Sequence, residues 1–175
     1  MYNHELLSGI LGILLRDMKK EAIKKQAERA LLLLKVMTLR KEKYLLTSKE
    51  LAGFFDKRQY EIKLYQNNNH EFSESERKEI TEKTNIDFVS TTCDSSALRL
   101  LFVDMKENEI EAMLQNAQIF GIVLKQRYKE NLLTASDIAS YCDVPEEKVL
   151  KWQSPNYHFS KKEMQNLINK FSISG

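Results

Sequence analysis

The stretch LLTASDIASYCDVPEEKVLKWQ, residues 132–153, decides the fold. Thr134 stands three residues before Asp137, which is the spacing of a helix N-cap and the acid that returns to it. Apolar residues then recur at helical spacing until Asp143-Val144-Pro145 interrupts them. Pro145 suits the first turn of a second helix, because no backbone N–H is needed there. Two short helices joined by such a turn make a helix-turn-helix.

The same pattern occurs a second time, earlier in the chain. A shift of 87 residues aligns residues 4–86 with residues 91–173 without a gap, and 22 of the 83 aligned pairs are identical. The identical pairs include Asp17/Asp104, Arg40/Arg127, Thr47/Thr134, Asp56/Asp143, Gln66/Gln153, Ser73/Ser160 and Glu76/Glu163. Unrelated helical segments share an apolar pattern, but they do not share this many identities in one register. We therefore interpret the chain as a tandem duplication, with one repeat at residues 1–87 and another at residues 88–175.

Length and composition agree with two small helical domains. A chain of 175 residues can form two domains of about 87 residues, each with a modest core. Charged residues make up 30% and hydrophobic residues 42%, which is typical of a globular chain and excludes a disordered one. No segment shows the period-two alternation of a strand. These features predict an all-α fold with helix-turn-helix units at about residues 47–66 and 134–153.

Further helices are expected on both sides of each unit. The first, from Glu5 to Met18, has a wide apolar face that must be buried in its own domain, between the repeats or in an oligomer. The next runs from Lys19 to Tyr44, and the cap pattern at Asp104 in the second half favours a break before it. The remaining expected segments are helices at 73–84, 98–103, 107–129 and 160–171 and a Ser- and Thr-rich linker at 88–97.

The two units and their surroundings resemble the lambda-repressor-like (Cro and repressor) class of helix-turn-helix DNA-binding proteins. In that class an arginine-bearing helix precedes the unit, and a capped helix follows it after a loop. Arg127 and Ser160 occupy these places here, and the match covers about 55 residues of each half, 32–86 and 119–173. The resemblance implies that the second helix of each unit lies in the major groove of DNA, with its N-terminal residues toward the bases.

In the first half the resemblance implies a polar and basic contact surface. The set comprises Ser48 and Lys49 at the start of the first helix, Lys57 and Arg58 in the turn, and Gln59, Tyr60 and Lys63 on the second helix. The residues of the turn can reach phosphates, whereas Gln can read adenine and Lys can read guanine. The alternative is an ordinary solvated helix face.

The second half offers a less favourable surface. Glu146, Glu147 and Leu150 occupy the base-facing positions, so Lys148 and Lys151 are the candidates for DNA contact there. Carboxylates near phosphates are unfavourable unless they accept hydrogen bonds from cytosine. Residues 1–87 hold 17 basic and 14 acidic residues, a net charge of +3, whereas residues 88–175 hold 10 and 11, a net charge of −1. The first half is therefore better suited to a polyanion.

Two functions agree with these observations. The first is a transcription regulator whose two helix-turn-helix domains bind double-stranded DNA as an intramolecular pseudo-dimer. The alternative is a non-enzymatic module that binds a protein component of replication or transcription. Such a protein contact, or a homodimer, would form through the second repeat or the Leu6–Leu15 helix.

No residue pattern predicts an enzyme, a cofactor or a metal site. Cys93 and Cys142 have no second Cys or His at ligand spacing, and the three histidines are scattered along the chain. No glycine-rich phosphate loop is present. The apolar stretch Leu6–Leu15 is too short to cross a bilayer, and no signal peptide precedes it. We therefore expect a cytoplasmic protein without a membrane contact.

Overall fold

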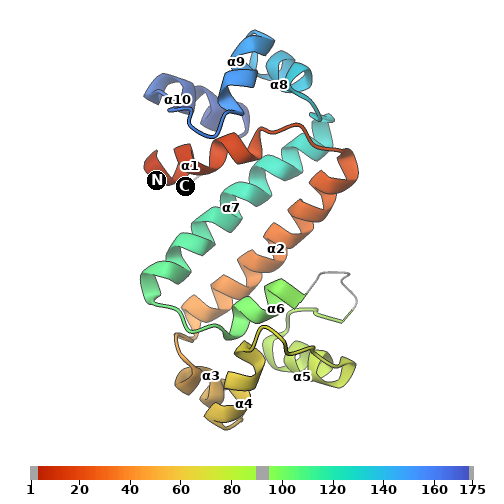
Figure 1. Cartoon of the computed structure of the whole chain (residues 1–175), viewed down its shortest axis with the longest axis vertical. Coiled ribbons are helices and arrows are strands. Elements are labelled where there is room, and N and C mark those ends of the chain that lie inside the picture. Colours follow the sequence, from red (N-terminus) through yellow and green to blue (C-terminus); the bar gives the residue numbers. More distant parts are fainter. Residues whose placement is uncertain (1–3, 90–94, 174–175) are drawn as a thin grey trace. The chain divides into compact units, whose positions relative to one another are not determined.

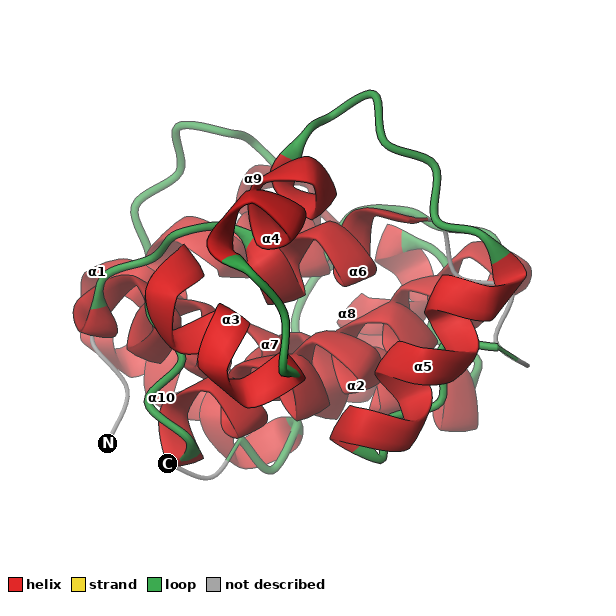
Figure 2. Cartoon of the chain, turned by 90° about the horizontal axis from the view of Figure 1, so that it is seen from below, coloured by secondary structure: helices red, strands yellow, loops and turns green. Residues whose placement is uncertain are grey.

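The computed structural model describes residues 4–89 and 95–173, which form α-helices joined by loops (Figures 1 and 2). The helices are α1 (His4–Leu14), α2 (Lys20–Glu42), α3 (Ser48–Phe55), α4 (Gln59–Gln66), α5 (Glu74–Thr84), α6 (Ser95–Phe102), α7 (Glu107–Glu130), α8 (Ala135–Cys142), α9 (Glu146–Trp152) and α10 (Lys161–Lys170). No strand occurs among these residues, so the prediction of an all-α fold is confirmed.

Helices and turns recur after 87 residues. Helices α2 to α5 begin at residues 20, 48, 59 and 74, and helices α7 to α10 begin at residues 107, 135, 146 and 161. The non-glycine residues with positive φ pair in the same way: Tyr44 with Asn131, Asp56 with Asp143, and Asn85 with Ser172. The two halves therefore share one order of helices and turns.

Two helix boundaries differ from the sequence-based expectation by three residues or more. Helix α1 ends at Leu14 rather than at Met18, because the residues after it form a connection that contacts the start of α8. In this connection Asp17 accepts a hydrogen bond from the Ala135 N–H. Residues 95–97, expected in the linker, begin α6, because Ala97 is buried in the core and extends the apolar face of that helix. Phe88 at the start of the expected linker is fully buried as well. Residues 90–94 of that linker lie outside the described residues.

The chain forms two compact units, and each combines residues from both halves. Unit 1 contains Met1–Ala30 and Gln115–Gly175, and unit 2 contains Leu31–Leu114. Helix α1 thus belongs with α8, α9 and α10, whereas α6 belongs with α3, α4 and α5. Helices α2 and α7 contribute residues to both units. The units therefore differ from the repeats expected at residues 1–87 and 88–175.

The length of the long helices explains why each unit combines residues from both halves. The 23 residues of α2 separate its two ends by about 35 Å, at 1.5 Å per residue. Helix α1 precedes α2 and α3 follows it, so α1 and α3 are joined to opposite ends of α2. Each short helix that precedes a long helix packs instead with the short helices of the other half.

The apolar stripe of α1 lies in the core of unit 1. Leu7, Leu11 and Leu14 are at most 1% exposed, which confirms that this stripe is buried. They share a core with residues of the second half, among them Ile138, Val149, Trp152, Leu167 and Phe171. Of the three expected positions of the stripe, the contact between the two halves is the one observed.

Helix α6 has the same place in unit 2. Leu98, Leu101 and Phe102 are fully buried. The ring of Phe102 lies 5.1 Å from that of Phe55 and 4.9 Å from that of Tyr65, between ring centres. Aromatic pairs at these separations add to the free energy gained by burial. The core of unit 2 is therefore built around the contact of α6 with α3 and α4.

A buried arginine joins these elements in each unit. Arg40 and Arg127 are 0% exposed. Arg40 donates hydrogen bonds to the carbonyl oxygens of Leu45, Leu46 and Leu100, at 2.8–3.1 Å. Arg127 donates to those of Leu132, Leu133 and Leu14, at 2.7–3.3 Å. Burial lowers the pKa of both arginines to about 10, so they stay charged at neutral pH, and the carbonyl groups replace the lost water.

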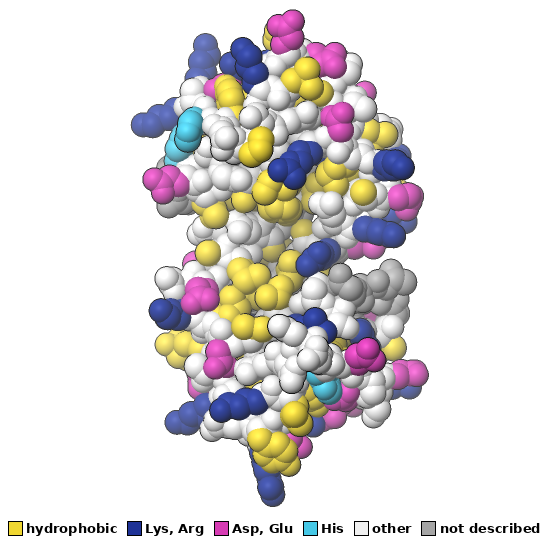
Figure 3. All heavy atoms as spheres, viewed as in Figure 1, with side chains coloured by type: hydrophobic (Ala, Val, Ile, Leu, Met, Phe, Trp, Pro, Cys, Tyr) yellow, Lys and Arg dark blue, Asp and Glu magenta, His cyan; other side chains and the backbone are white. Residues whose placement is uncertain are grey.

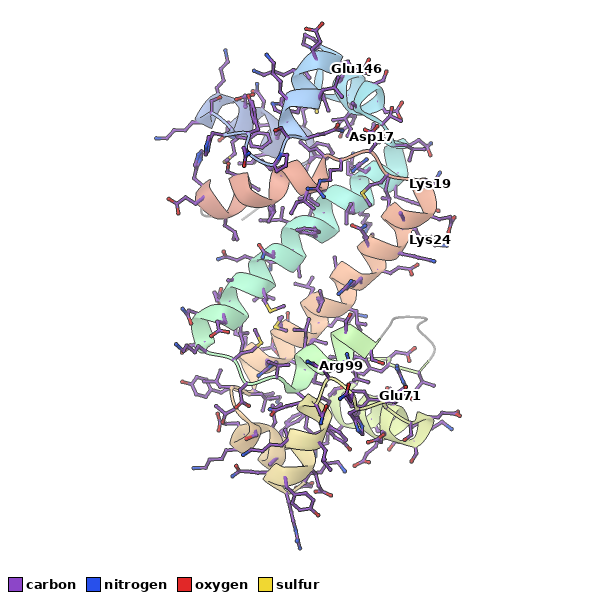
Figure 4. All side chains as sticks on the ribbon, in the orientation of Figure 1. Asp17, Lys19, Lys24, Glu71, Arg99 and Glu146 are labelled. Carbon is purple, nitrogen blue, oxygen red and sulfur yellow. The ribbon has the colours of Figure 1, made fainter. Side chains whose placement is uncertain are left out.

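In each unit an aspartate and a glutamine add further hydrogen bonds between the connection before the long helix and the short helices. In unit 1, Asp17 lies in the connection between α1 and α2 (Figure 4), and its Oδ1 accepts hydrogen bonds from the Ala135 N–H and from Gln153 Nε2, both at 2.9 Å. In unit 2, Asp104 accepts from the Ser48 N–H at 2.9 Å and from Gln66 Nε2 at 2.8 Å. Each carboxylate thus satisfies a free N–H at a helix N-terminus, where negative charge is stabilising.

Tyr44 gives a first testable prediction about stability. Its φ of 55° is left-handed, a conformation that costs a non-glycine residue about 1–2 kcal/mol and that Asn tolerates better. Asn131 holds the same turn in the other half. Tyr44→Asn should therefore raise the free energy of unfolding by about 0.5–1 kcal/mol, measured by urea denaturation. Tyr44→Ala is the control, and an equal gain in that variant would refute the backbone explanation.

Candidate nucleic-acid interface

The turn between α3 and α4 is held by its backbone. Asp56 has a φ of 53° and closes α3, and the Lys57 N–H donates to the carbonyl oxygen of Ala52 at 2.9 Å. The Arg58 N–H donates to the Glu61 carboxylate at 2.8 Å, which fixes the start of α4. The turn between α8 and α9 has the same form, with Asp143 at a φ of 57°. Both pairs of helices therefore meet at a short turn of fixed geometry.

Helix α4 buries one face and exposes the other. Ile62 and Tyr65 lie in the core, whereas Tyr60 and Leu64 are 59% and 55% exposed. The exposed polar residues of this surface are Lys49, Arg58, Gln59 and Lys63. None of these side chains makes a hydrogen bond or an ion pair with another described residue. Five predicted contact residues, Tyr60 included, are thus available to a partner.

Ser48 is less suited to the role predicted for it. The residue is only 6% exposed, and its backbone N–H already donates to Asp104. A carboxylate of the protein thus occupies the position at the start of α3 where a phosphate would accept this hydrogen bond. The identity of Asp17 and Asp104 in the two halves was the sequence signal for this contact.

Lys57 and Lys148 are occupied within their own units. Lys57 Nζ lies 3.0 Å from the Glu79 carboxylate, and this hydrogen bond raises the pKa of Lys57. Lys148 Nζ lies 3.1 Å from the Glu163 carboxylate, which likewise raises the pKa of Lys148. A phosphate would have to compete with these partners, so both lysines are weaker candidates for DNA contact than the sequence predicts.

Helix α9 presents a different surface from α4. Glu146, Glu147 and Lys151 are exposed, and Leu150 is 53% exposed. Figure 4 shows Glu146 at the start of α9, the place of Gln59 on α4. On the face drawn in Figure 3, the described acidic and basic side chains are interspersed.

Glu163 organises the structure beneath α9. Its carboxylate accepts hydrogen bonds from Trp152 Nε1 at 2.8 Å, the Ser160 N–H at 3.0 Å and the Tyr157 hydroxyl. Burial acts to raise the pKa of Glu163, but these hydrogen bonds and the ion pair with Lys148 outweigh it and lower the pKa to about 2. In this way one carboxylate links α9, the following loop and α10.

Glu163 predicts an acid-dependent loss of stability. Its pKa is lower in the folded state than the ordinary 4.5, so its contribution is complete above pH 4.5 and is lost as the pH falls toward 2. Relative to Glu163→Gln, the native protein should lose roughly 1–3 kcal/mol of unfolding free energy across this interval. Urea titrations at several pH values would measure the difference. Parallel pH curves for the two proteins would contradict the prediction.

Other kinds of site find no support in the described part of the chain. No group of three or more His, Cys, Asp or Glu side chains is arranged there to hold a metal ion. No helix among the described residues has both the length and the apolar character needed to cross a membrane. Comparisons of this chain with protein-family models, with curated proteins and with solved structures gave no match.

Proposed function

We propose that this protein is a DNA-binding regulator of transcription, in which two helix-turn-helix units arose by tandem duplication. The observation that carries the proposal is the exposed set on and before α4: Lys49, Arg58, Gln59, Tyr60 and Lys63. These side chains have no partner among the described residues and lie beside a turn of fixed geometry. The resemblance to the lambda-repressor-like class, which rests on the order of the helices and their caps, implies that these residues face DNA.

In this proposal α4 lies in the major groove. Lys49 and Arg58 flank its N-terminal end, where they can neutralise phosphates. Gln59 and Lys63 carry the hydrogen-bonding groups suited to base edges, and Tyr60 adds an apolar surface for a thymine methyl group. Unit 2 would thus supply both positioning and base contacts.

Unit 1 has a secondary role in DNA binding. Glu146 and Glu147 stand where α4 has Gln59 and Tyr60, and they repel phosphates. Lys151 is the one exposed lysine of α9 without an ion pair among the described residues. We therefore assign the main DNA contact to unit 2 and a weaker half-site to unit 1.

The proposal predicts which basic residues matter. Arg58→Ala with Lys63→Ala should weaken binding to a duplex DNA pool about tenfold or more at low salt, because two contacts are removed from α4. Fluorescence anisotropy with labelled DNA would measure this, with circular dichroism to confirm the fold. Sequencing of fragments selected from random DNA would then define the preferred site.

Two variants of α9 serve as matched controls. Lys151→Ala should change DNA affinity much less than the α4 variant, because unit 1 makes the weaker contact. Glu146→Lys with Glu147→Lys should raise non-specific affinity, since repulsion is replaced by attraction. If Lys151→Ala is the more damaging change, the roles of the two units are reversed.

A second candidate function is supported by α9 itself. Leu150 is 53% exposed between acidic and basic neighbours, a pattern that suits a protein surface better than DNA. In this alternative, unit 1 binds a protein component of replication or transcription. Leu150→Glu would then abolish capture of that component while leaving the DNA affinity of unit 2 unchanged.

A further inference from the structure

Unit 1 contains a pocket beside α9. It has a volume of about 510 Å³ and lies among the turn after α8, helix α9 and helix α10. Its apolar lining is formed by Cys142, Val144, Trp152 and Leu167. The volume falls within the range of about 300–1,000 Å³ that is typical of small-molecule sites. None of the DNA-contact residues proposed for α4 lines this pocket.

The corresponding region of unit 2 is crossed by an ion pair. In the 87-residue register Val144 corresponds to Lys57, and Asn166, also in the pocket lining, corresponds to Glu79. Lys57 Nζ lies 3.0 Å from Glu79 and 5.9 Å from the ring centre of Tyr65. Unit 1 has no counterpart of this ion pair, because Val144 and Asn166 are uncharged.

At Cys142 the lining of the pocket also differs from the corresponding position of unit 2. Its counterpart in unit 2 is Phe55, a larger side chain that is buried in the core. Burial raises the pKa of the Cys142 thiol to about 11, so the thiol is neutral at pH 7 and adds to the apolar lining. Three lining positions of the pocket thus differ in size or charge from their counterparts in unit 2.

The charges around the pocket favour an anion. Its lining includes Lys148, Lys162 and Lys170 and a single carboxylate, Glu163. Glu163 is already neutralised by Lys148 and by its other donors, and Lys170 pairs with Asp143 at 2.9 Å. Lys162 makes no ion pair with a described residue, so it is available to an anionic ligand.

We propose that this pocket binds a small carboxylate with a medium-length apolar chain. The chain lies against Cys142 and Val144, which are half-buried, and the carboxylate pairs with Lys162. Burial of the chain supplies the free energy of binding, because apolar surface leaves water. The inference concerns unit 1 by itself and does not depend on DNA binding by unit 2.

Titration with hexanoate, octanoate and decanoate tests this proposal. Trp152 is the only tryptophan, so its indole N–H resonance reports directly on the pocket, and calorimetry gives the affinity. Affinity should rise by up to about fourfold for each added methylene group, and octan-1-ol should bind more weakly than octanoate. Equal binding of octan-1-ol and octanoate, or no change of the Trp152 resonance at millimolar decanoate, would overturn the proposal.

Variants with larger side chains in the pocket provide the matched control. Val144→Lys with Asn166→Glu copies the ion pair of unit 2 into unit 1 and should reduce decanoate affinity at least about tenfold. Cys142→Phe copies the larger side chain of unit 2 and should have the same effect by a separate route. The fold of each variant is checked by circular dichroism. Undiminished decanoate binding in a folded variant of either kind would refute the pocket as the site.

Discussion

Replacement of Arg40 by Met is expected to lower the free energy of unfolding of unit 2 by about 3–5 kcal/mol. Arg40 is fully buried, and its guanidinium donates to the carbonyl oxygens of Leu45, Leu46 and Leu100. Met fills much of the volume but removes the donor that Arg40 supplies to the carbonyl oxygens of Leu45 and Leu100, whereas that of Leu46 still accepts from the Met105 N–H. Each unsatisfied buried group costs about 1–3 kcal/mol. Lys is not an adequate substitute, because its single ammonium group cannot reproduce the planar fork.

Hydrogen exchange of the amides in α3 to α6 would measure this loss, since these helices belong to unit 2. Arg127→Met is the matched variant, and it should lower protection in α8 to α10 instead. Arg29→Met is the surface control, because Arg29 is exposed and should tolerate the change. Protection that falls equally for Arg40→Met and Arg29→Met would show that the buried hydrogen bonds contribute little.

Leu11→Ala should destabilise unit 1 by roughly 2–5 kcal/mol. Leu11 is 0% exposed and shares a core with residues of α8, α9 and α10. Removal of its side chain forfeits buried apolar contact and leaves a cavity. The effect should appear in the unit that carries most of the second half, although Leu11 itself belongs to the first half.

Trp152 makes this prediction simple to measure. It is the only tryptophan and is buried in unit 1, so its fluorescence follows the unfolding of that unit in urea. The midpoint of the fluorescence change should fall for Leu11→Ala. Ile13→Ala is the control on the same helix, since Ile13 is exposed. If Leu11→Ala instead lowers hydrogen-exchange protection in α3 to α5, α1 packs with its own half, and the packing of α1 with the second half is wrong.

Much of the local structure could be predicted from the sequence. Thr134 with Asp137 and Ser160 with Glu163 marked helix starts that the structure confirms, because capping patterns act over three or four residues. The burial of Leu7, Leu11 and Leu14 followed from helical periodicity. Gln59, Tyr60 and Lys63 were expected on an exposed face, and they are exposed.

The packing of α1 and α6 with the opposite half of the chain could not be predicted in the same way. An apolar stripe shows that α1 is buried but does not identify its partner, because apolar contacts are not directional. Asp17, Gln153 and Arg127 each bond to a backbone group far along the chain. Their identity in both halves was the visible signal, and it was read as evidence of duplication rather than of docking.

The ion pairs of Lys57 and Lys148 could not be predicted from the sequence for a related reason. Lys57 and Lys148 look like free cations along the chain, but folding brings Glu79 and Glu163 to them. Ser48 looks like an exposed helix start, yet Asp104 covers its N–H. Tertiary neighbours therefore reduce the predicted contact surface to Lys49, Arg58, Gln59, Tyr60 and Lys63, with Lys151 in the other unit.

The salt dependence of DNA binding tests the proposed function most directly. Each phosphate contact contributes about 0.9 to the slope of log affinity against log salt concentration. Arg58 is the member of this pair assigned to a phosphate, so Arg58→Ala with Lys63→Ala should reduce the magnitude of this slope by about 0.9 relative to the native protein, whereas Lys151→Ala should change it by less than half as much. Identical slopes for the native protein and the α4 variant, or no binding of the native protein to duplex DNA at low salt, would contradict DNA binding through α4.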